Sequence, residues 1–379
     1  MKSLGRTIVG CLSLVITIAL AQPAAASTEG KKALDELIAQ AKKEGDLTTQ
    51  VVRQAGRIVP KLMNAFKKRF GLDNLKTHIA KGGQSRAYAQ LFATLGAGGK
   101  PPYDVYPGAG DNVIELMHAG HAQKIANWRL LLAEINPLVR SGKVKPEEVS
   151  PSPFTGYAMS FAGRNKVLIY NPKLISRKDL PKSRVDIANP KYKGNYALGS
   201  FTSEWELGTL VYDKDKWLKT LDKIGKNAAG VMHTTQAKNR LLLGEFAFYP
   251  GNFYHYLSAK AKDSDAPIGY RWFSDGTATT QIFYIIPKDS RHPAVGTLFS
   301  MWIGTPEAEG IWQPPSFYTN IHWGQSDYDK MARKTLKESG SKLLSFYDSP
   351  ESLEVLKWFG TDKGKAYRRS ITNKIRQRR

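Results

Sequence analysis

Four short segments of the sequence place small polar residues where a strand is expected to end and a helix to begin. Backbone N–H groups at a helix N-terminus are free to bind an anion, and the helix dipole adds positive potential there. The same Ser and Thr side chains can instead be ordinary helix N-caps. Four such segments in one fold predict a shared anion-binding site. They contain Gly83, Gln84, Ser85 and Arg86, then Gly108 and Gly110, then Thr202 and Ser203, and finally Thr234 and Thr235.

Two arginines strengthen this prediction. The guanidinium groups of Arg53 and Arg86 can pair in a bidentate manner with phosphate, phosphonate or carboxylate groups. Each arginine can equally be an ordinary surface residue. Together with the polar segments, the two arginines favour a small organic anion as the ligand.

Composition and motifs exclude several other classes of protein. The chain has 379 residues, and 56 Lys and Arg against 33 Asp and Glu give a net charge of +23. The sequence holds no P-loop, H-E-x-x-H or G-x-S-x-G motif, so we expect neither an enzyme nor a cofactor. The only cysteine, Cys11, lies in an N-terminal segment that we expect to be removed. The mature chain then has no disulfide, thiolate metal site or cysteine nucleophile.

The N-terminal segment has the features of a secretory signal peptide. Lys2 and Arg6 precede an apolar stretch at 8–21, and three alanines at 24–26 form a cleavage site. The apolar stretch is shorter than the roughly 20 residues of a membrane-spanning helix. We therefore predict a signal peptide at 1–26, cleavage after Ala26 and a periplasmic location. No nucleic-acid partner is expected for such an exported protein.

The elements that position the polar segments are those of an α/β fold. Helices alternate with short strands, which predicts βαβ units and mostly parallel sheets flanked by helices. Ligands bind beyond the carboxyl ends of such strands, where loops lead into helices. Two long extended segments, at 156–170 and 281–286, interrupt the alternation.

The last residues, 361–379, form a strongly basic tail. Eight basic residues and one acid, Asp362, give this tail a charge of +7. The simplest expectation is a solvated extension. The alternative is weak contact with an anionic membrane surface or a polysaccharide.

From about 33 to 323 the chain resembles the extracellular solute-binding proteins of ABC importers, in the branch that contains the ferric-ion binders. No single motif of this resemblance is specific, but the order and spacing of the motifs together are. The predicted signal peptide independently agrees with an exported solute-binding protein. The matching stretches are 37–45, 65–71, 100–105, 168–171, 189–194, 244–245, 291–294 and 300–307.

The resemblance implies a two-lobed type II periplasmic-binding fold that closes on its ligand about hinge crossover strands. By analogy the chain crosses near 163–164 and returns near 280–281. The implied partners are a small-molecule ligand and an ABC permease, and a monomer is expected. The implied parts are a first lobe at 27–163 and 281–326, a second lobe at 164–280, C-terminal helices at 327–360 and the basic tail.

Members of the ferric branch bind iron through two adjacent tyrosines, often with a His and a Glu. The matching stretch here runs from Asn252 to Tyr256, but Phe253 stands at the first tyrosine position. Ferric iron needs several anionic oxygen ligands, so iron is the second choice of ligand. Its candidate ligands are Tyr254, His255 and Tyr256, and Asn252 and Tyr254 are also candidate contacts for an anion.

The anion contacts of that branch correspond to Ser203, Glu204, Trp205 and Thr234. Trp205 is bulkier than the residue usual there, which suggests an altered pocket or stacking against an organic ligand. The resemblance therefore favours a binding protein for a phosphate, phosphonate or carboxylate compound. The alternatives from other classes are a basic surface-adhesion protein and an enzyme on a similar fold.

Overall fold

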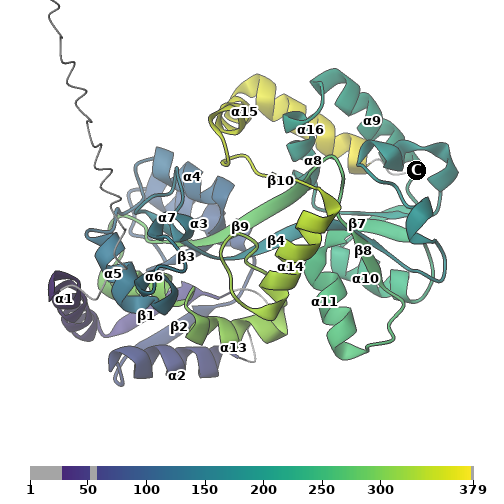
Figure 1. Ribbon diagram of the computed structural model, residues 1–379. Coiled ribbons are helices and arrows are strands. Elements are labelled where there is room, and N and C mark those ends of the chain that lie inside the picture. Colours follow the sequence, from purple (N-terminus) through teal and green to yellow (C-terminus); the bar gives the residue numbers. More distant parts are fainter. Residues whose placement is uncertain (1–27, 52–57, 377–379) are drawn as a thin grey trace, which may run out of the picture.

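The computed structural model describes residues 28–51 and 58–376. The predicted signal peptide and Arg53 lie outside these residues. In Figure 1 two long strands, β4 (Ala158–Tyr170) and β9 (Thr277–Ile285), run through the centre of the molecule. One lobe lies on each side of them, with α1 to α7 in lobe 1 and α8 to α11 in lobe 2. The two-lobed α/β fold that the sequence predicts is confirmed.

Lobe 1 begins with helices whose ends follow local sequence signals. α1 (Thr28–Glu44) is followed by Gly45 at a φ of +68°, and α2 (Val59–Phe70) has Pro60 in its first turn. Gly71 takes the left-handed conformation that ends α2. The other elements of lobe 1 are β1 (Asp46–Gln50), β2 (Lys76–Ala80), α3 (Gln84–Gly96), β3 (Tyr106–Ala109), α4 (Gly110–His118), α5 (Trp128–Ile135), α6 (Pro137–Arg140), α7 (Pro146–Val149), α12 (Pro293–Trp302) and α13 (Pro306–Ser316).

The apolar stripe of α2 forms the centre of lobe 1. Phe66 is fully buried, and its ring contacts those of Phe299 and Trp302 on α12 at centroid distances of 5.3 and 5.4 Å. Residues that precede the lobe 2 segment in the chain thus share one core with residues that follow it, and this core holds lobe 1 together.

Lobe 2 has its own two apolar clusters, one of them around Trp217 and Phe248 and the other around Tyr249 and Phe253. Tyr196 stacks on Phe248 with ring centroids 5.2 Å apart. The elements of lobe 2 are the short 3-10 helices η2 (Arg177–Asp179), η3 (Val185–Ala188), η4 (Pro190–Tyr192) and η5 (Leu207–Leu210), the strands β5 (Ala197–Gly199), β6 (Gly230–Met232), β7 (Phe248–Asn252) and β8 (Gly269–Arg271), and the helices α8 (Ser203–Glu206), α9 (Lys214–Asn227), α10 (Thr234–Leu242) and α11 (Phe253–Lys262).

The crossover strands pair with each other at the proposed lobe boundaries. Gly163 on β4 lies opposite Gln281 on β9, and Arg164 lies opposite Thr280. On the face of β4 away from α8, the side chain of Asn165 donates to the Thr319 hydroxyl at 2.8 Å and accepts from the Thr279 hydroxyl at 2.9 Å. These buried bonds join the chain crossing, its return and the segment after α13 at one place.

The sheets are less parallel than the sequence predicts. Among the described strands, β1 and β2 pair in parallel, as do β5 and β6, and β9 and β10. The pairs of β3 with β9, and of β4 with β7, β8 and β9, are antiparallel. The expectation of mostly parallel sheets is thus wrong at the centre, because a chain that crosses between lobes and returns must run in opposite directions.

The C-terminal segment is a packed part of the molecule. It contains α14 (Asp327–Ser339), β10 (Leu343–Leu344), α15 (Pro350–Gly360) and α16 (Asp362–Arg376). In Figure 1 α16 lies along α9 and α8 of lobe 2. Ile371 and Ile375 of α16 are fully buried in lobe 2. The expected solvated extension is therefore wrong for 362–376, because two apolar side chains one turn apart bury this helix.

Leu353 and Leu356 of α15 pack instead against the lobe 1 cluster around Tyr88 and Tyr106. The C-terminal helices thus contact both lobes. No helix among the described residues is long and apolar enough to cross a membrane.

Candidate ligand-binding site

Three strands of lobe 2 end side by side and lead directly into helices. β5, β6 and β7 end at Gly199, Met232 and Asn252, and the helices α8, α10 and α11 follow. Gly199 and Thr234 lie in close contact, since a Cβ atom at Gly199 would be 3.0 Å from the Thr234 side chain. The predicted residues Thr234 and Asn252 are both buried at this edge. This is the position where α/β sheets bind ligands.

A buried ion pair crosses this edge. Lys166 on β4 lies opposite Asn252 on β7, and its Nζ is 2.5 Å from Oε2 of Glu204 on α8. The side chains are 14% and 6% exposed. Apart from this ion pair, both Glu204 oxygens are buried without a hydrogen-bond partner. Sequence reasoning did not single out Lys166, although a charged residue within the apolar strand 158–170 is a usable signal.

His255 supplies a hydrogen-bond donor next to this pair. Its Nδ1 is 2.9 Å from the Tyr249 hydroxyl and accepts from the Asn252 backbone N–H at 3.3 Å. Burial lowers the pKa of His255 well below its ordinary value of 6.5, and the positive charge of Lys166 acts in the same direction. The neutral ring therefore carries its proton on Nε2. That atom is buried without a partner, as is Oδ1 of Asn252.

Arg164 adds a further donor from the hinge. Side chains alternate along a strand, so Arg164 and Lys166 lie on the same face of β4, about 7 Å apart. Nε of Arg164 is buried and has no hydrogen-bond partner. Arg164, Lys166 and His255 thus form a donor-rich cluster. Its unpaired donors are unusual, because buried polar groups normally have hydrogen-bond partners. We refer to these three residues with Glu204 and Asn252 as the hinge cluster.

Other predicted residues near α8 have different surroundings. The Thr202 hydroxyl is 3.0 Å from that of Thr372 on α16, and Ser203 is the first residue of α8. Thr235 is exposed at the start of α10. Trp205 is only 1% exposed and packs beside Trp217, whose indole N–H donates to the Trp205 carbonyl. The predicted stacking of Trp205 on a ligand is wrong for this structure, because the core of lobe 2 encloses its ring.

In lobe 1, the predicted segment before α3 lies at the surface. Gly83 is the N-cap of α3 in an extended conformation, and Gly83, Ser85 and Arg86 are exposed. Gln84 is half-buried. These residues present the N-terminus of a helix to solvent, and their contact with a ligand remains a prediction.

The second predicted segment of lobe 1 is covered by aromatic rings of the same chain. A Cβ atom at Gly108 would overlap the Tyr88 side chain, and one at Gly110 would overlap Tyr347. The Tyr347 hydroxyl accepts from the backbone N–H of Gln281 at 3.2 Å. Gly108 and Gly110 thus allow two tyrosines to pack closely, and no local sequence pattern indicates that Tyr347 lies here.

Comparison with known proteins agrees with this architecture. Residues 61–318 match the family of bacterial extracellular solute-binding proteins. The chain belongs to this family. The resemblance proposed from the sequence is confirmed, and so is the expectation that the chain is not an enzyme, since this is a family of binding proteins.

Relatives of this solute-binding protein differ in what their names say they bind. It is 25% identical over 229 residues to an Fe(3+)-binding periplasmic protein of Serratia marcescens. That match covers 60% of this chain and 58% of the relative. Iron-bound HitA from Pseudomonas aeruginosa superimposes with a TM-score of 0.67 at 20% identity, over 86% of this chain and 99% of HitA.

The spermidine/putrescine transporter substrate-binding protein PotD from Streptococcus pneumoniae gives a TM-score of 0.58 at 12% identity. That match covers 85% of this chain and 99% of PotD. At these identities, the two solved structures establish the shared fold alone.

The candidate iron ligands of this solute-binding protein point into three environments. Tyr254 packs on Tyr318 and against the lobe 1 core, whereas Tyr256 stacks on Phe253 in the core of lobe 2. His255 takes part in the hinge cluster. Successive helical residues diverge by about 100°, so α11 separates these side chains. Among the described residues, no group of three or more His, Cys, Asp or Glu side chains could hold a metal ion.

Proposed function

We propose that this protein captures a small organic anion between its lobes, at the hinge cluster, and delivers it to the permease of an ABC importer. The anion carries phosphate, phosphonate or carboxylate groups. Export through the predicted signal peptide, with cleavage after Ala26, places the protein in the periplasm as a monomer. The lobes, bounded at 163/164 and 280/281, close on the ligand by bending of β4 and β9.

The observation that carries this proposal is the set of buried, unpaired donors around Lys166. Nε of Arg164 and Nε2 of His255 both have a proton to donate and no acceptor. Hydrogen bonds to a charged acceptor contribute about 1.5–3 kcal/mol each, against about 1 for neutral ones. Among possible ligands, an anion would bind these donors most strongly, because its hydrogen bonds to them are charge-assisted. These bonds would offset the cost of burying the donors without partners.

The hinge cluster is not purely cationic, and this bears on the ligand. Glu204 already pairs with Lys166, so the cluster holds one balanced pair with Arg164 beside it. A bound anion shares Lys166 with Glu204 and occupies the remaining donors. This arrangement favours an anion of low charge with several oxygens over a large polyanion.

Ferric iron is the second candidate, because the Serratia marcescens relative is named for it. Tyr254 on α11 is the candidate oxygen ligand at a position that matches the ferric branch, and Phe253 stands where the other tyrosine would be. Tyrosinate coordination to iron gives a visible charge-transfer band. A stoichiometric coloured complex that is lost in Tyr254→Phe would therefore replace the anion proposal with the iron proposal.

The direct test is native mass spectrometry of the protein purified without refolding, followed by a calorimetric screen. The screen compares phosphates, phosphonates and carboxylates with polyamines and neutral sugars. We expect a copurified anion, and saturable binding of one anion class to protein stripped of ligand. Tight binding of a polyamine or a sugar, with no anion bound, would overturn the proposal.

A further inference from the structure

Three basic residues of α16 lie on one face of the helix together with two polar residues. Lys365, Arg368, Arg369, Thr372 and Asn373 follow the i, i+3, i+4, i+7, i+8 spacing of a single helical stripe. A neighbouring face, about 100° round the helix and containing Gly364, Ile371 and Ile375, is buried. The basic residues that the sequence analysis assigns to a solvated tail therefore lie on an ordered helix.

Contacts of its C-terminal half fix α16 to lobe 2. Besides the bond between Thr372 and Thr202, Nη2 of Arg376 donates to the Ser200 carbonyl at 2.8 Å. Lys374 donates to Asp222 on α9 at 2.8 Å. Gly225 of α9 lies so close to the Lys374 carbonyl that a Cβ atom there would overlap it. The basic stripe therefore has a rigid support.

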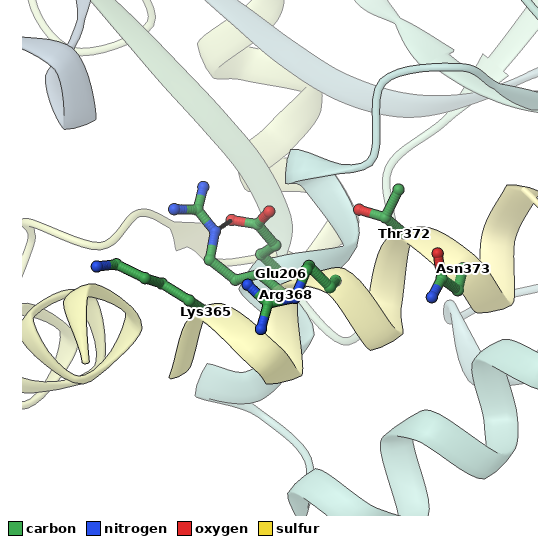
Figure 2. Close-up of a pocket in the computed structure, with 6 residues that line it drawn as sticks. Glu206, Lys365, Arg368, Thr372 and Asn373 are labelled. Carbon is green, nitrogen blue, oxygen red and sulfur yellow. Dashed lines mark ion pairs between the residues drawn. The ribbon is translucent and has the colours of Figure 1, made fainter. Parts of the chain in front are cut away.

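A shallow cavity of about 470 Å³, open to solvent, lies beside this stripe and is lined by α16 and by Glu206 of α8. Figure 2 shows the lining side chains, with Glu206 reaching from α8 toward Arg368. Nε of Arg368 is 2.9 Å from Oε2 of Glu206, whose side chain is only 8% exposed. The guanidinium of Arg368 also lies over the Phe359 ring at 5.5 Å. Arg368 is thus held in place from two sides.

The cavity carries more positive charge than its own carboxylate can balance. Lys365, Arg368 and Arg369 line it with the single acid Glu206. Lys365 and Arg369 are exposed, and no ion pair or hydrogen bond joins either side chain to another of the described residues. Thr372 and Asn373 add neutral polar groups to the same wall. The lining suits a small molecule with two or more negative charges.

This cavity is separate from the hinge cluster. Residues two apart on a helix point about 200° apart, and Glu204 and Glu206 do so on α8. Glu204 pairs with Lys166 on β4, whereas Glu206 pairs with Arg368 on α16. The two acids of α8 therefore belong to two sites on opposite sides of this short helix.

We propose that the cavity between α8 and α16 is a second anion-binding site, which takes a small multivalent anion bearing phosphate or carboxylate groups. Arg368, oriented by Glu206, and the exposed charges of Lys365 and Arg369 hold the anion. The site is independent of the ligand proposed at the hinge cluster.

The test is calorimetric titration of ligand-free protein with sodium phosphate and with sodium citrate at low ionic strength. The double variant Lys365→Ala/Arg369→Ala changes two exposed residues four positions apart. We expect it to bind the better of the two anions at least tenfold more weakly than the unchanged protein. The control Lys219→Ala/Lys223→Ala removes two exposed lysines at the same spacing from α9. We expect the control to bind like the unchanged protein.

Equal weakening in both double variants would show a non-specific charge effect and overturn the proposal. Absence of saturable binding of either anion would overturn it too. If Lys166→Met abolishes all anion binding and Lys365→Ala/Arg369→Ala leaves it intact, the hinge proposal stands and the α16 proposal fails. A second arm tests vesicles with and without anionic phosphatidylglycerol. Binding to anionic vesicles alone, lost in Lys365→Ala/Arg369→Ala, would assign the stripe to a lipid surface instead.

Discussion

The loops that follow the strands of the two lobes differ in what they offer to a ligand. In lobe 2 they lead to the hinge cluster, where Glu204 is buried, Lys166 is mostly buried and His255 has an unpaired ring nitrogen. In lobe 1, Arg86 is exposed, and Gly110 lies under the Tyr347 ring. The Tyr88 hydroxyl, also buried without a partner, is the comparable group of lobe 1.

This contrast has a structural cause. β4 carries Arg164 and Lys166 to the edge of lobe 2, where the loops before α8, α10 and α11 meet it. The corresponding edge of lobe 1 is occupied by the C-terminal segment around Tyr347. We therefore expect binding chemistry to concentrate in lobe 2, with lobe 1 closing over it. The lobes should respond differently to mutation.

The largest effect is expected from Lys166→Met. This change leaves the Glu204 carboxylate buried without its countercharge, which typically costs about 3–5 kcal/mol of folding free energy. It also removes a charged donor, so anion binding should weaken by about tenfold to a hundredfold. Urea unfolding and calorimetry measure the two effects.

Lys166→Met/Glu204→Gln separates stability from binding. This double variant removes both charges, so most of the folding free energy should return while anion binding stays weak. Strong anion binding by the double variant would show that Lys166 does not contact the ligand. A single variant as stable as the unchanged protein would show that the pair is more solvated than its 6% and 14% exposure implies.

An intermediate effect is expected from two neighbouring buried acidic side chains. Glu309 on α13 and Asp329 on α14 share the Gln313 amide, which donates to them at 3.3 and 3.2 Å. Burial, and then the negative charge of Asp329, raise the pKa of Glu309 well above its ordinary value of 4.5. The folded protein thus holds a proton there that the unfolded chain releases.

The contribution of this proton to stability is fully present below pH 4.5 and is lost progressively as the pH rises, by at most about 1.4 kcal/mol per pH unit. Glu309→Gln keeps a donor without the titration. Its melting temperature should therefore fall less between pH 5 and pH 8 than that of the unchanged protein. Parallel pH profiles from calorimetric scans would contradict the shifted pKa.

The smallest effect is expected from Arg86→Ala in lobe 1. Because Arg86 is exposed, its loss should change the folding free energy by less than about 0.5 kcal/mol. Anion affinity should fall by about twofold at most. A loss of affinity as large as that in Lys166→Met would show that lobe 1 supplies the anion's main partner and would reverse the contrast between the lobes.

Much of the fold could be predicted from local patterns. Pro60 and Gly71 mark the ends of α2, and the apolar residues between them have helical spacing. The two extended segments that interrupt the alternation are β4 and β9, the strands that pass between the lobes. Pairing direction could not be predicted, because it depends on where the chain returns rather than on either strand alone.

The candidate site was predictable only in outline. Thr234 follows a short strand and Asn252 ends one, and those positions alone indicate a ligand-binding edge. Lys166 and Glu204 are 38 positions apart in the chain, and no local pattern pairs a charge in a strand with one in a distant helix. Trp205 has the residue type of a stacking group, but burial beside Trp217 decides its role.

By itself the sequence determined the alternation of helices and strands, the net charge of +23 and the absence of any thiol after Cys11. These properties depend on residue types and near-neighbour spacing, which the chain carries in any conformation. The tertiary structure alone decided which charges are buried together, that Tyr347 covers Gly110, and that three basic residues of α16 line a shallow cavity. Each of these depends on contacts between distant segments, whose free energy arises only when folding removes water from both sides.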